Sequence, residues 1–202
     1  MKIGIIGIGS LTMEIAFRSA RAGFKVIIYN HRGNSLVRDV AEKMGSNVTL
    51  GSLEQACDMD IIVLHIPKDD LEKVIDNMPD MSGKLILHTS GLIFDPHSLL
   101  SGIINALTYQ ITASLLPKAH VVKLFHPVSL QPKSTEHQNA TKEQIFFIAD
   151  HSKSGNSVKA FLKQLHFSPF DLSGKLHFQT GILHQKTMIN PFQTNPFKNN
   201  FN

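Results

Sequence analysis

A glycine-rich turn near the start of the chain constrains the fold most strongly. Gly7-Ile8-Gly9-Ser10-Leu11-Thr12 directly follows an apolar run over residues 3–6 and directly precedes a helical pattern. A strand, such a turn and a helix in this order are the fingerprint of a dinucleotide-binding site. The first glycine allows a tight turn, the second lets the backbone approach a pyrophosphate, and the helix N-terminus attracts its charge. Thr12 occupies the third fingerprint position, where Gly or Ala is usual, so the motif is imperfect.

Strand-like and helix-like segments alternate after this turn. Ser10 is predicted to cap the first helix, and Gly23 and Gly45 to follow the ends of the first and second helices. The alternation predicts an α/β protein, an NAD(P)-binding Rossmann fold with a doubly wound, mainly parallel sheet of about six to eight strands. Strands are predicted over residues 2–6, 25–29, 48–50, 60–66, 84–88, 121–125, 145–149 and 170–172, and helices over 10–22, 35–44, 53–57, 68–77, 107–116 and 154–165.

The organisation along the chain predicts one Rossmann domain over residues 1–177, with residues 145–175 as its last β-α-β part. Residues 178–202 differ in composition, because Asn, Gln, Pro and Phe dominate and the tripeptide Asn-Pro-Phe occurs twice. We expect these residues to form an extended or poorly ordered tail.

Composition and charge narrow the classes of function. The chain of 202 residues has a net charge of +4, but its basic residues are scattered, which does not favour nucleic acid as a partner. Neither a signal peptide nor an apolar stretch of about 18 residues is visible, so no membrane association is predicted. The single cysteine fits a reducing cytosol, and a cytoplasmic protein is expected. The eleven histidines show no ligand spacing, so no metal site is predicted.

The end of the second predicted strand indicates which dinucleotide is bound. An acidic residue there would accept a hydrogen bond from the ribose 2′-hydroxyl of NAD. The strand ends instead in Tyr29-Asn30-His31-Arg32, with Asn30 in the place of the acid. A guanidinium suits the 2′-phosphate of NADP, so Arg32 favours NADP over NAD.

Two later strands end in histidines that should border the same ligand. His65-Ile66-Pro67 follows the fourth strand and His88-Thr89-Ser90-Gly91 the fifth. Ligands of such sheets bind at the carboxyl ends of the strands. The two histidines suit either polar lining or acid–base chemistry, whereas His126, after the sixth strand, is the best single candidate for a proton role. No residue is assigned as catalytic.

An ordered set of segments resembles a known family. The chain resembles the deazaflavin-dependent NADP reductases, whose fold also forms the reductase domain of the STEAP metalloreductases. The segment with His88 and Phe125-His126-Pro127 is also similar to relatives of pyrroline-carboxylate reductase. The family segments are residues 2–12, 26–34, 58–67, 115–125, 147–150 and 164–173.

The family resemblance implies NADP(H) as cofactor and hydride transfer at the carboxyl edge of the sheet. It implies phosphate contacts from the turn, 2′-phosphate contacts after the second strand and packing along the cofactor after the fourth. The chain departs from the family at Thr12, at His31 and at Leu124-Phe125-His126, where bulky residues would crowd the nicotinamide. The predicted cofactor-binding residues are Gly7, Gly9, Ser10, Leu11, Thr12, Asn30, His31, Arg32, His65, Ile66, Pro67 and Thr89.

Two functions follow as hypotheses. The first is an NADP(H)-dependent oxidoreductase that transfers hydride between NADP(H) and a second redox cofactor or acceptor of the deazaflavin, flavin or ferric type. The alternative is a non-catalytic NADP-binding sensor or interaction module. The expected partner is a small molecule or cofactor substrate, and the sequence leaves a homodimer open.

Overall fold

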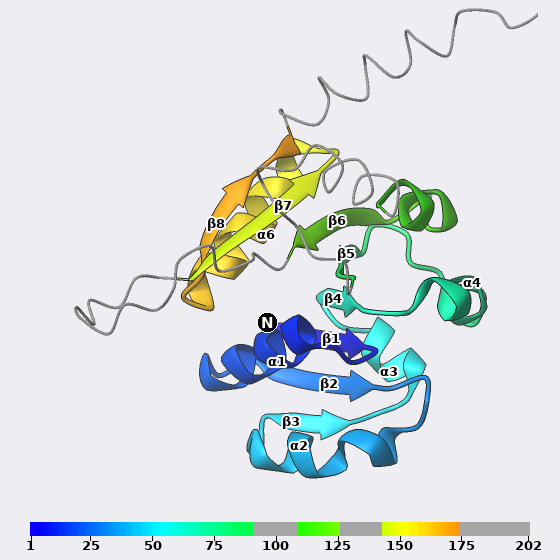
Figure 1. Cartoon of the computed structure of the whole chain (residues 1–202), viewed down its shortest axis with the longest axis vertical. Coiled ribbons are helices and arrows are strands. Elements are labelled where there is room, and N and C mark those ends of the chain that lie inside the picture. The colour runs from blue at the N-terminus through cyan, green and yellow to red at the C-terminus, as the bar shows by residue number, and fades with distance from the viewer. Residues whose placement is uncertain (91–108, 126–142, 174–202) are drawn as a thin grey trace, which may run out of the picture.

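A single twisted sheet organises the protein. The structure, a computed structural model, describes residues 1–90, 109–125 and 143–173. Within them the strands lie in the order β3-β2-β1-β4-β5-β6-β7-β8, with β1 to β3 at one end and β7 and β8 at the other (Figure 1). The strands are β1 (Lys2–Ile6), β2 (Lys25–Tyr29), β3 (Val48–Leu50), β4 (Ile61–Leu64), β5 (Leu85–His88), β6 (His120–Phe125), β7 (Gln144–Ala149) and β8 (Ser168–Asp171).

The strand directions confirm the predicted fold class. Strands β1 to β6 pair in parallel, β7 pairs antiparallel with β6, and β8 pairs parallel with β7. The order reverses between β1 and β4, which both border the glycine turn. In open α/β sheets this switch point is where ligands bind, outside the carboxyl ends of the strands.

Helices cover both faces of the sheet. Helices α1, α2 and α6 pack with buried residues such as Ile5, Val63 and Phe147 into one core. Helices α3 and α4 and the helical residues 109–115 pack with residues such as Ile62 and Ile86 into the other. The helices are α1 (Ser10–Arg21), the 3₁₀ helix η1 (Asn34–Val37), α2 (Arg38–Lys43), α3 (Leu53–Cys57), α4 (Lys68–Asp76) and α6 (Ser152–Gln164).

Two local predictions need correction. Gly9, not Ser10, caps α1, because Gly9 has extended backbone angles and its carbonyl oxygen accepts the hydrogen bond from the Met13 N–H. The helix predicted over residues 35–44 is a 3₁₀ turn followed by a short α-helix. Gly23 and Gly45 do follow helix ends, with φ of 80° and 95°, as predicted.

Several predictions fall outside the described residues, namely those for the tail, the boundary at residue 177, Gly91 and His126. Among the residues that the structure does describe, no helix is long and apolar enough to span a membrane. The same residues contain no cluster of His, Cys, Asp and Glu suited to a metal ion.

Candidate functional site

The glycine turn is shaped by the end of β4, which packs directly against it. A Cβ atom added to Gly7 would lie 1.9 Å from the carbonyl oxygen of His65, and Gly7 has φ of +83°. A Cβ atom on Gly9 would lie 2.6 Å from Nε2 of the same histidine. Gly7 therefore requires glycine, because its Cβ atom would meet backbone atoms, whereas a side chain at Gly9 would have to displace the His65 ring.

The buried Thr12 side chain stabilises the turn through hydrogen bonds to Gly9. Its side chain is fully buried, and its hydroxyl accepts a hydrogen bond from the Gly9 N–H at 2.8 Å and donates one to the Gly9 carbonyl oxygen at 2.9 Å. The next backbone N–H groups, those of Ser10, Leu11 and Thr12, precede the first possible intrahelical acceptor, so helix geometry leaves them available. The first turn of α1 contains no acidic residue. The turn can therefore bind an anion such as a pyrophosphate.

The Asn30 side chain is buried and forms its hydrogen bond within the loop after β2, instead of pointing into solvent. Its exposed fraction is 5%. Its amide nitrogen donates to the Gly33 carbonyl oxygen at 2.9 Å, and its backbone N–H donates to Oδ1 of Asn34 at 2.8 Å. Gly33 has φ of +108°, which favours glycine. These bonds fix the loop that carries the next two residues.

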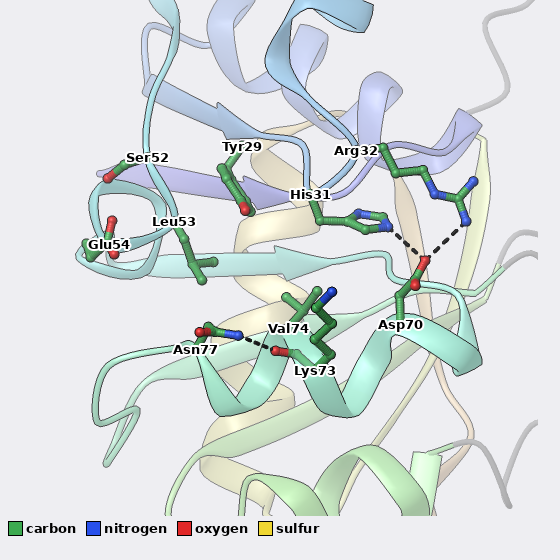
Figure 2. Close-up of a pocket in the computed structure, with 10 residues that line it drawn as sticks. All are labelled: Tyr29, His31, Arg32, Ser52, Leu53, Glu54, Asp70, Lys73, Val74 and Asn77. Carbon is green, nitrogen blue, oxygen red and sulfur yellow. Dashed lines mark hydrogen bonds and ion pairs between the residues drawn. The ribbon is translucent and has the colours of Figure 1, made fainter.

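His31 and Arg32 share one carboxylate. Nε2 of His31 and a terminal nitrogen of Arg32 each lie 3.1 Å from Oδ2 of Asp70, in the first turn of α4 (Figure 2). Hydrogen bonds from Arg32 and then His31 hold the pKa of Asp70 below its usual range. Sequence reasoning missed Asp70, because an acidic pair at a helix start also suits the helix dipole.

A pocket of about 650 Å³ opens beside this ion pair. It lies at the carboxyl end of β2, between the start of α3 and one side of α4 (Figure 2). Its lining combines an aromatic ring and aliphatic side chains with amide, hydroxyl and charged groups, as small-molecule pockets usually do. The lining residues are Tyr29, His31, Arg32, Ser52, Leu53, Glu54, Asp70, Lys73, Val74 and Asn77.

The ends of β4 and β5 meet at the other side of the glycine turn. Nδ1 of His65 lies 2.9 Å from the Thr89 hydroxyl, and the same hydroxyl donates to the Leu64 carbonyl oxygen at 3.4 Å. Burial, and next the charge of Lys123, lower the pKa of His65. Ile66 is buried and Pro67 caps α4. The structure thus places His65 and Ile66 against the glycine turn, with Thr89 bonded to His65 and Pro67 at the start of α4.

A second polar cluster lies where β5 and β6 end; the sequence pointed to His88 and Ser90, but Lys123 and Thr112 were missed. Lys123 is fully buried and pairs in register with His88. Its amine donates to the Ser90 hydroxyl at 2.7 Å and lies 6.0 Å from the centre of the Phe125 ring. Nδ1 of His88 lies 3.1 Å from the Thr112 hydroxyl. The only sequence signal for Lys123 was its position as one charged residue within an apolar strand.

Burial dominates the electrostatics of this cluster. It lowers the pKa of Lys123 to about 7. Burial, with a smaller effect of the Lys123 charge, lowers the pKa of His88 to about 3. His88 is therefore neutral at pH 7, whereas the Lys123 amine is poised to gain or lose a proton near that pH.

The two ends of the site differ in chemistry. The carboxyl ends of β1 to β3 border the glycine turn, Arg32 and the pocket, whereas the ends of β5 and β6 border the buried amine. Comparison with known proteins agrees with this geometry. Residues 2–90 match the family model "NADP oxidoreductase, coenzyme F420-dependent". The predicted family resemblance is confirmed over these residues, and the match indicates an NADP-dependent oxidoreductase. No protein of curated function matches the chain.

Solved structures share the fold over most of the chain. A hypothetical protein from Sinorhizobium meliloti is 26% identical with a TM-score of 0.67, over 86% of this chain and 85% of that one. A protein from Arthrobacter sp. with a provisional assignment as an F420-dependent NADP reductase is 16% identical, with a TM-score of 0.60 over 93% and 94%. An imine reductase from Myxococcus stipitatus in complex with NADP⁺ is 14% identical, with a TM-score of 0.58 over 93% and 61%.

Proposed function

We propose that the protein transfers hydride between NADP(H) and a second redox cofactor or acceptor. The observation that carries the proposal is Arg32 at the end of β2, next to the pocket and with no carboxylate on that strand end itself. A guanidinium there suits a 2′-phosphate and offers nothing comparable to a 2′-hydroxyl.

The residues of the site fit such a dinucleotide. Because a Cβ atom at Gly7 or Gly9 would collide with His65, the bare glycines let the turn pack against β4 and leave its backbone open to a pyrophosphate. Nδ1 of His31 is buried without a hydrogen-bond partner among the described residues, as expected for a group that a ligand completes. We assign the pyrophosphate to the N–H groups at the start of α1, the 2′-phosphate to Arg32 and His31, and the adenine ring to the pocket.

Arg32→Ala tests the choice of dinucleotide. We expect about a tenfold or greater loss of NADPH affinity and little change for NADH, because only the 2′-phosphate has a charge-assisted bond to lose. Dissociation constants from nucleotide fluorescence titrations measure both. Arg21→Ala, which removes an equal charge from the opposite end of α1, is the matched control. Equal loss of both affinities would refute the assignment of Arg32.

The second acceptor is proposed from the family resemblance and from Lys123. Full reduction of a deazaflavin or flavin by hydride from NADPH also takes up a proton, whereas oxidation of NADPH by two one-electron ferric acceptors releases one. A buried amine with a pKa of about 7 would hold that proton at Nζ, and this favours a deazaflavin or flavin over a ferric acceptor.

Comparison of acceptors as a function of pH tests this part. Reduction of a deazaflavin or flavin by NADPH should slow as the pH rises through about 7, since the amine then loses its proton. The slowing should disappear in Lys123→Met. Faster reduction of a ferric chelate, with no dependence on Lys123, would argue for the ferric class.

A non-catalytic sensor is the second candidate function. Leu124 and Phe125 are almost completely buried at the end of β6, so neither lines an open surface for a second substrate. NADPH binding without turnover of any deazaflavin, flavin or ferric acceptor would favour this alternative. Whether two copies associate is a separate proposal, which sedimentation of the whole chain decides.

A further inference from the structure

Asp70 occupies the cationic groups that are assigned to the 2′-phosphate. Its Oδ2 atom accepts one hydrogen bond from Arg32 and contacts Nε2 of His31, both at 3.1 Å. Figure 2 shows the carboxylate pointing at both side chains from the start of α4. Two residues from the loop after β2 and one from the start of α4 therefore form one small charged cluster in the wall of the pocket.

The carboxylate and a 2′-phosphate would compete for the same donors. Arg32 has a fork of donors and is 62% exposed, so it can turn toward either anion. Because its pKa is lowered, Asp70 stays ionised at neutral pH. A phosphate bound to Arg32 either displaces this carboxylate or lies within a few ångströms of it, and both outcomes reduce affinity. A ribose 2′-hydroxyl carries no charge and meets neither penalty.

We propose that Asp70 is a specificity-determining residue that competes with the 2′-phosphate of NADP for Arg32 and His31. This inference rests on the proposed function, since it presupposes that NADP binds at Arg32. Asp70 thereby makes the preference for NADP over NAD smaller than the arginine alone would give. Replacement of the carboxylate by an uncharged group of the same shape should enlarge that preference.

Asp70→Asn is the decisive variant, with Asp69→Asn as its matched control. Asp69 is also in the first turn of α4, but it is exposed and has no described bond to Arg32. We expect Asp70→Asn to bind NADPH about fivefold more tightly and NADH with unchanged affinity, from loss of an exposed ion pair and of a like-charge contact. The fragments 2′,5′-ADP and 5′-AMP should show the same difference by calorimetry.

A double variant tests whether Arg32 transmits the effect. The gain from Asp70→Asn should vanish when Arg32 is already alanine, because no donor remains to be released. Unchanged or weaker NADPH binding by Asp70→Asn would overturn the inference and leave the proposed function standing. A gain that persists without Arg32 would also overturn it. Lack of NADPH binding by every variant would refute the proposed function and this inference together.

Discussion

Replacement of Lys123 by methionine should make the protein more stable at neutral pH. The amine has an ordinary pKa of 10.5 and a folded-state pKa of about 7. The unfolded chain therefore binds a proton that the folded protein gives up between these values. One pH unit in this window corresponds to about 1.4 kcal/mol, so burial of the amine costs up to about 5 kcal/mol at pH 7.

Methionine fills a similar volume without a charge, but it leaves the Ser90 hydroxyl without the hydrogen bond that the amine donates. That loss is worth about 1 kcal/mol. The net expectation for Lys123→Met is a gain of roughly 2–4 kcal/mol at pH 7, within the range seen when buried ionic groups are replaced by apolar ones.

The pH dependence gives the sign of the effect. Wild-type stability should rise with pH through the window above pH 7, because the unfolded state binds more protons there. The free energy of unfolding, measured in urea from pH 7 to pH 9, should therefore converge on that of Lys123→Met as the pH increases. Lys159→Met, on the exposed side of α6, should change stability by no more than about 0.5 kcal/mol. A Lys123→Met protein that is no more stable, with a difference independent of pH, would refute the reasoning.

Two glycine substitutions test how closely β1 and the turn after it pack against their neighbours. Gly9→Ala should lower the free energy of unfolding in urea by about 1–3 kcal/mol and weaken NADPH binding. The cause is its Cβ atom, which would lie 2.6 Å from the His65 ring and displace it. Most of the stability cost should disappear in a His65→Ala background. Gly4→Ala should cost at least about 3 kcal/mol, since its Cβ atom would lie 2.0 Å from the backbone oxygen of Ala56, and a smaller loss would show that α3 shifts easily.

The fold could be predicted from the sequence because most strands and helix ends have a signal within a few neighbouring residues. Continuous apolar runs such as that of β4 are typical of strands buried on both faces. Glycines directly after α1 and α2 indicate where these two helices end. The prediction that Ser10 caps α1 was wrong. Serine favours the cap position, but here the Thr12 hydroxyl bonds to the Gly9 N–H, and the helix begins one residue earlier. That contact depends on the turn already being formed.

The site could be predicted only where one segment carries its own signal. Arg32 lies next to the strand end that chooses the dinucleotide, so its position alone was informative. Its contact with Asp70 joins residues 38 apart in the chain, and Lys123 meets Ser90 across 33 residues. Such contacts arise from the order of strands in the sheet, and a single sequence contains no local pattern for them.

The two charged parts of the site differ in their exposure to solvent, and therefore in how much their charges affect stability. The cluster of Arg32, His31 and Asp70 is partly exposed, so solvent screens its ion pairs and they can be exchanged for a ligand. Lys123 is fully buried, and its charge costs several kcal/mol, by the order of magnitude usual for a buried ion. Dinucleotide preference can therefore change by substitution at α4 with little effect on folding. The buried amine destabilises the fold, and such a cost is typical of a group that serves chemistry rather than folding.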